Sequence, residues 1–73
     1  MILNVVVETL PGKAQCVAEV IGEIKGMALR LVDGDHRVLA TWDVPDGHNP
    51  EPEGLSEALR AMTPEVVDVG LGD

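Results

Sequence analysis

The stretch Met27-Ala-Leu-Arg-Leu-Val-Asp-Gly-Asp-His-Arg-Val-Leu-Ala-Thr-Trp-Asp-Val44 decides the fold of this chain. It reads as two strands, Met27 to Asp33 and Arg37 to Val44, because apolar side chains recur at alternate positions in each. The residues between them, Asp33-Gly34-Asp35-His36, contain the Asp-Gly pair that favours a tight turn between antiparallel strands. The sequence therefore predicts a β-hairpin near the centre of the chain.

One predicted helix precedes this hairpin and another follows it. Apolar residues spaced by three and four predict the first helix over Lys13 to Lys25, with Pro11-Gly12 before it and Gly26 after it. The same spacing predicts the second helix over Glu53 to Met62, and the Thr63-Pro64 pair that follows cannot continue a helix. Each helix has a single apolar stripe, so each is expected to cover part of a core.

Two further strands complete the pattern at the two ends of the chain. Leu3 to Glu8 and Glu65 to Leu71 both show strand-like alternation. The resulting order, β-α-β-β-α-β, is the split βαβ or ferredoxin-like plan. We therefore expect an α+β sandwich in which a four-stranded antiparallel sheet, in the order 4-1-3-2, carries both helices on one face. Residues 1–73 are predicted to form one domain.

Alternation also assigns the strand residues to the two faces of the sheet. The side chains expected between the sheet and the helices are Val5, Val7, Leu29, Leu31, Ala40, Trp42, Val67 and Val69 from the strands, with Val17, Val20, Ile21, Ile24, Leu55 and Leu59 from the helices. Two helices cover only one face, so the other stays open to water or to a partner. The peptide-binding site predicted on that open face consists of Val6, Glu8, Arg30, Val32, Leu39, Thr41, Val66 and Asp68. An apolar patch with a polar rim is typical of a surface that binds an amphipathic peptide helix.

Composition and charge limit the classes of partner. The 73 residues include 13 acidic and 5 basic side chains, and the formal net charge is -8. Such a chain repels phosphate backbones and attracts basic peptides, so nucleic acid is not expected as a partner. The sequence has no signal-peptide pattern and no long apolar segment, which together with a single cysteine favours a cytoplasmic protein that does not insert into a membrane. A weak homodimer is left open.

The sequence contains no pattern typical of an active site or a metal site. Cys16 lies beside the apolar stripe of the first predicted helix and is expected to be a structural, at least half-buried thiol. His36 and His48 fall in a turn and a Pro-rich loop, where a surface position is the default. The chain is therefore not expected to be an enzyme or to hold a metal ion or cofactor.

Several segments carry a resemblance to a known family. They are Val5-Val6-Val7, Ile24-Lys25-Gly26-Met27, the central hairpin, and Leu59-Arg-Ala-Met-Thr-Pro-Glu-Val-Val-Asp-Val69. With these, the whole chain resembles the NapD family of small cytoplasmic chaperones, which share the ferredoxin-like fold and assist the maturation of periplasmic nitrate reductase. The resemblance implies binding of the twin-arginine signal peptide of a molybdoenzyme catalytic subunit, which is held back from export until its molybdenum cofactor is inserted.

A second resemblance supports an alternative function. The segment Thr9-Leu-Pro-Gly-Lys-Ala14 resembles the loop of ACT-like domains in which a glycine lets a small amino acid approach the backbone. An amino-acid sensor is thus the alternative. An acylphosphatase-like enzyme would need an Arg and an Asn in this loop, and the loop contains neither.

Overall fold

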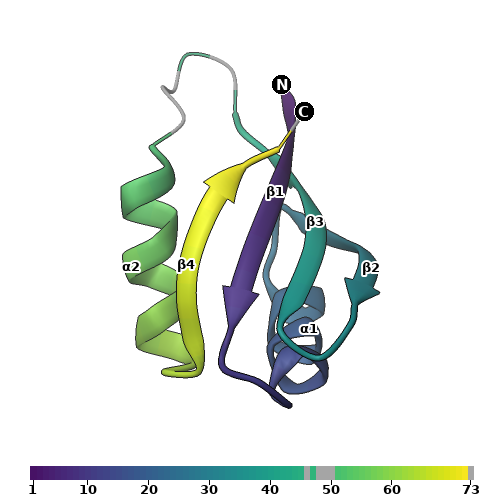
Figure 1. The fold of residues 1–73 in the computed structure, drawn as a ribbon. Helices are drawn as coiled ribbons and strands as arrows, with labels where there is room; N and C mark the ends of the chain where they lie inside the picture. Colours follow the sequence, from purple (N-terminus) through teal and green to yellow (C-terminus); the bar gives the residue numbers. More distant parts are fainter. Residues whose placement is uncertain (46, 48–50, 73) are drawn as a thin grey trace.

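The computed structural model describes residues 1–45, 47 and 51–72. Its elements, in chain order, are β1 (Ile2–Thr9), α1 (Ala14–Glu23), β2 (Met27–Asp33), β3 (Arg37–Asp43), α2 (Pro52–Met62) and β4 (Val66–Leu71), as Figure 1 shows. The strands form one antiparallel sheet in the order β2-β3-β1-β4. This is the predicted 4-1-3-2 order counted from the other edge, so the ferredoxin-like fold is confirmed. No described helix is long and apolar enough to cross a membrane.

The first helix is shorter than predicted. It ends at Glu23, and Ile24 already has an extended backbone, with its amide donating to the carbonyl of Ile21 over 3.1 Å. Gly26 follows with a φ of 91°, a conformation that favours glycine. This turn brings the Gly26 carbonyl to the amide of Asp43 at 2.7 Å and so starts β2 beside β3. The other predicted ends are within one residue of those observed, and His48 lies outside the described residues.

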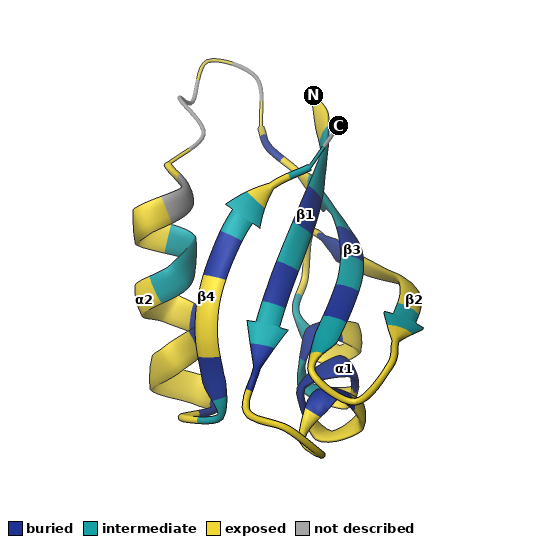
Figure 2. Ribbon diagram, viewed as in Figure 1, coloured by how far each residue is buried: buried dark blue, intermediate teal, exposed yellow. Residues whose placement is uncertain are grey.

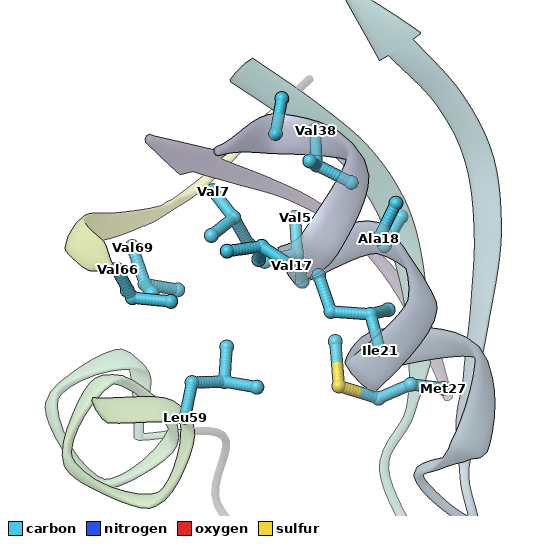
Figure 3. Packing of buried hydrophobic residues seen from close by; sticks show 12 residues of the cluster. Val5, Val7, Val17, Ala18, Ile21, Met27, Val38, Leu59, Val66 and Val69 are labelled. Atoms are coloured by element: carbon cyan, nitrogen blue, oxygen red, sulfur yellow. The ribbon is translucent and has the colours of Figure 1, made fainter. Parts of the chain in front are cut away.

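Both helices cover the same face of the sheet. Val17 and Ile21 of α1 and Leu59 of α2 are fully buried in one apolar cluster (Figure 3). The strands contribute alternate residues to it, and this alternation is visible along β1 in Figure 2. The predicted core residues confirmed as buried are Val5, Val7, Val17, Ile21, Ala40, Leu59 and Val69, while Ile24, Trp42 and Leu55 are partly buried against them. The core positions predicted for Val20 and Leu29 were wrong, because Val20 is only half-buried, Leu29 on the edge strand β2 is 44% exposed, and both lie outside this cluster.

An irregularity in β2 makes two predicted assignments wrong. Leu29 pairs with Ala40 while Leu31 pairs with Leu39, so Arg30 is an extra residue opposite one position of β3. Because side chains alternate with a period of two, an extra residue moves everything after it to the other face. Leu31, predicted in the core, is therefore 54% exposed and shares a face with Leu39. Val32, predicted on the open face, packs against the core instead.

A second irregularity, between β1 and β4, reverses two more assignments. Glu8 pairs with Asp68 but Thr9 pairs with Val66, which leaves Val67 as the extra residue on β4. Val66, predicted on the open face, is only 4% exposed and belongs to the core cluster. Val67, predicted in the core, is 47% exposed. The cause is again one inserted residue, which shifts the alternation of side chains between the two faces of the sheet by one position.

Candidate functional site

The uncovered face of the sheet carries an apolar row that runs across all four strands. The residues that pair in turn are Leu31 of β2, Leu39 of β3, Val6 of β1 and Gly70 of β4. Directly paired residues of an antiparallel sheet point to the same side, so these positions lie next to one another. Val6 and Leu39 are half-buried by their neighbours, and the Leu31 side chain projects at the β2 edge. We call this set the apolar row.

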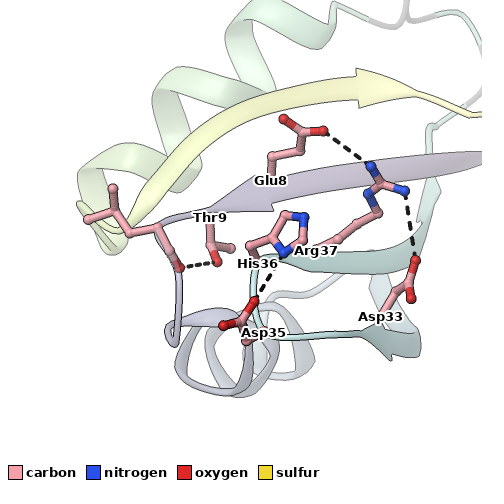
Figure 4. A network of polar contacts seen from close by, with 7 residues as sticks. Glu8, Thr9, Asp33, Asp35, His36 and Arg37 are labelled. Carbon is pink, nitrogen blue, oxygen red and sulfur yellow. Dashed lines mark hydrogen bonds and ion pairs between the residues drawn. The ribbon is translucent and has the colours of Figure 1, made fainter.

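A charged row lies parallel to the apolar row on the same face, two residues further along each strand. Its members are Asp33 of β2, Arg37 of β3, Glu8 of β1 and Asp68 of β4, again paired in turn. The guanidinium group of Arg37 lies between two carboxylates, 3.6 Å from Glu8 Oε1 and 3.7 Å from Asp33 Oδ2 (Figure 4). Both ion pairs are solvent-exposed, so each contributes only about 0–1 kcal/mol to stability.

The charged row is not balanced. The row contains three carboxylates and one guanidinium group, and Glu8 lies directly opposite Asp68, a like-charge arrangement that destabilises a sheet. Asp68 Oδ1 accepts a hydrogen bond from the Val69 amide at 3.0 Å, and within the described part of the chain no cation forms a salt bridge with it. Asp68, at the β4 end, is therefore the acid of this row that has no ion pair among the described residues.

A polar row flanks the other side of the apolar row. Asn4, Thr41 and Ala28 pair in turn across β1, β3 and β2. Arg30 Nη1 donates to Asn4 Oδ1 at 2.9 Å, which brings the guanidinium group of Arg30 across the sheet to this row. The open face thus has acids on one side of its apolar row and polar groups with one cation on the other.

Six of the eight predicted peptide-binding residues lie together on this face, namely Val6, Glu8, Arg30, Leu39, Thr41 and Asp68. Val32 and Val66 do not, because both are turned into the core. Leu31, Arg37 and Asp33 belong to the face but were absent from the predicted set. The sequence did contain a signal for Asp33 and Arg37, since these residues close the predicted hairpin turn and must pair with each other.

The loop after β1, which carries the alternative resemblance, is bonded to the hairpin turn. The amides of Gly12 and Ala14 donate to the Asp35 carbonyl at 2.9 and 3.2 Å, and the amide of Thr9 donates to the His36 carbonyl at 2.8 Å. These three backbone amides therefore already donate hydrogen bonds within the chain and are not free to bind an amino acid. Figure 4 shows His36 and Asp35 in this turn, where their exposed side chains lie 3.1 Å apart.

Among the residues that the structure describes, the remaining chemical groups do not assemble into a site. Cys16 is exposed, so the prediction of an at least half-buried thiol was wrong; it lies on the side of α1 away from the core. Among the described residues, no group of three or more His, Cys, Asp or Glu side chains could hold a metal ion. No family model, curated protein or solved structure matches the chain.

Proposed function

We propose that this chain is a cytoplasmic chaperone of the NapD type, which binds the twin-arginine signal peptide of a periplasmic nitrate reductase or related molybdoenzyme before export. The observation that carries the proposal is the open sheet face, where an apolar row lies beside a charged row with three carboxylates and one guanidinium group. A signal peptide of this kind combines an apolar segment with arginines. The face therefore offers a counterpart to each part of the peptide.

The binding surface of this proposal differs from the one predicted from the sequence. Leu31 takes the place of Val32 at the β2 end, and Gly70 takes the place of Val66 at the β4 end. The apolar contact is expected over Val6, Leu39 and Leu31, and the arginines of the peptide are expected beside Glu8 and Asp68. Burying a leucine side chain contributes about 1.5–3 kcal/mol, whereas an exposed ion pair contributes less than about 1 kcal/mol. The apolar row should thus supply most of the affinity.

Backbone amide shifts on titration with a synthetic twin-arginine signal peptide test the location. The largest changes are expected at Val6, Leu39 and Leu31. Changes confined to residues 9–14 would contradict the proposal and favour the amino-acid sensor, which a parallel titration with free amino acids would then identify. The absence of any change would also contradict it.

A matched pair of variants tests the contribution of the apolar row. Leu31→Ser removes an exposed side chain from the face and should weaken peptide binding about tenfold, which corresponds to about 1.4 kcal/mol. Met62→Ser is the control, because Met62 is 58% exposed but lies on α2, on the covered side of the sheet. Equal affinity of the two variants, measured by calorimetry, would exclude Leu31 from the site.

Salt dependence tests the electrostatic part. Exposed charges are screened beyond about 8 Å at physiological ionic strength, so affinity should fall as salt is raised from low to high concentration. Replacing Glu8 and Asp68 with Gln and Asn should flatten this dependence. A steep salt dependence that persists in the double variant would show that other acids attract the peptide.

A further inference from the structure

Both edges of the sheet have features that hinder pairing with an additional strand. On β2, the extra residue Arg30 interrupts the regular edge. On β4, Arg60 Nη2 donates to the carbonyl of Val67, and the carboxylate of Asp68 accepts from the amide of Val69. Bulges and side chains that occupy edge groups are the usual means by which sheets avoid pairing with other chains. A partner of this protein is therefore expected on the face rather than at an edge.

A segment that lies on the face receives no backbone hydrogen bonds from the sheet, because the strand amides and carbonyls are used within the ladder. Buried backbone groups need partners, so such a segment must form its own hydrogen bonds. A helix satisfies this condition with every bond inside the segment. The face thus favours a helical partner.

The three rows define the direction in which such a helix lies. All three rows run across the strands, the apolar and charged rows from β2 to β4 and the polar row from β2 to β1. A helix parallel to the strands would cross all three and place apolar residues on charges. A helix across the strands keeps its apolar stripe on Leu31, Leu39 and Val6 and one flank beside the acids. Three strand spacings of about 4.8 Å give a length of about 14 Å, or about ten helical residues.

The uneven charge also defines which end of the helix lies over which strand. The N-terminus of a helix carries partial positive charge and is stabilised by nearby carboxylates. Glu8 and Asp33 share the guanidinium group of Arg37 at 3.6 and 3.7 Å, whereas Asp68 of β4 has no ion pair among the described residues. The β4 end of the row also has room, since a Cβ added at Gly70 would meet nothing within 4 Å.

We propose, building on the function proposed above, that the open face fixes the orientation of its partner. The partner is an amphipathic helix that lies across the strands along the apolar row, with its N-terminus over β4. Its cations lie on one flank only, an N-terminal one beside Asp68 and a later one beside Asp33. The face thereby selects for the spacing of cations along a helix as well as for their number.

Two synthetic peptides test this orientation. Each is an 18-residue capped helix with one leucine stripe and a single arginine on the same flank, either near the N-terminus or eleven residues later, about 16.5 Å further along the helix. Calorimetric affinities are measured for the unaltered protein and for Asp68→Asn and Asp33→Asn. In Asp68→Asn, the Asn side chain retains an oxygen that can accept the hydrogen bond from the Val69 amide. Glu19→Gln, an exposed change of equal charge on α1, is the control.

Asp68→Asn should weaken only the peptide with the N-terminal arginine, and Asp33→Asn only the other, each by about twofold to fivefold, as expected for an exposed ion pair. The reverse pairing would overturn the N-terminus-over-β4 assignment. Equal effects of both variants on one peptide would overturn the orientation across the strands and leave the proposed function intact. The absence of binding by both peptides would overturn both proposals.

Discussion

Replacement of Leu59 with Ala should remove a large part of the stability of this protein. Leu59 is 0% exposed, and it is the residue through which α2 enters the core cluster, with Leu55 only partly buried beside it. Buried Leu→Ala changes cost about 2–5 kcal/mol, because the cavity that remains collapses only in part. A protein of 73 residues has a total stability of about 4–11 kcal/mol. One substitution on one helix should therefore remove between about a fifth of this stability and all of it.

Urea titration followed by circular dichroism measures this effect. With a slope of about 1 kcal/mol/M, a loss of 2 kcal/mol lowers the midpoint by about 2 M urea. Met62→Ala is the control, since it removes a similar side chain from the same helix at a position that is 58% exposed. A loss in Leu59→Ala no larger than that of the control would refute the placement of α2. A lower slope with an unchanged midpoint would show instead that α2 detaches before the sheet unfolds.

Three further changes test other parts of the fold. Ile21→Ala, at a fully buried position of α1, should cost about 2–5 kcal/mol in the same titration, and a change near zero would remove Ile21 from the core. Gly34→Ala should cost about 1–2 kcal/mol because Gly34 has a φ of 70°, whereas Gly22→Ala in α1 should be neutral or stabilising. The hydroxyl of Thr63 donates to Glu65 and is the main cause of a lowered pKa of that carboxyl. A lowered pKa adds stability that is lost as pH falls through the folded pKa, so Thr63→Val should be less sensitive to acidification below about pH 4.5; parallel pH profiles would contradict this.

The order of elements could be predicted from the sequence because each element has its own periodicity and its own boundary residues. Pro11-Gly12, Gly26 and Thr63-Pro64 all stand where the helices begin or end, within three residues of the observed positions. The Asp-Gly pair fixes the hairpin, and the hairpin together with two helices leaves few arrangements of four strands. These signals are local, so a single sequence is sufficient to reveal them.

The two bulges could not be predicted, because each depends on the register between two paired strands, which the residue pattern of one strand does not reveal. In β2, Leu29 and Leu31 are two apolar residues at alternate positions, which is what an unbroken strand also requires. Nothing local distinguishes Arg30 as an extra residue. In β4, Val66 and Val67 are chemically identical, so their pattern does not reveal which one faces the helices. The register with β1 decides, and it places Val66 opposite the buried Thr9.

The same irregularities shape the candidate site. The extra residue in β2 turns Leu31 outward and Val32 inward, so the apolar row extends to the sheet edge while the core still receives a valine there. Without it, Val32 rather than Leu31 would stand near the end of the row, and the regular edge of β2 would be available to other strands. An inserted residue thus supplies apolar surface on the face and removes a pairing site at the edge. The face that we propose for peptide binding therefore depends on the positions of its bulges as much as on its composition.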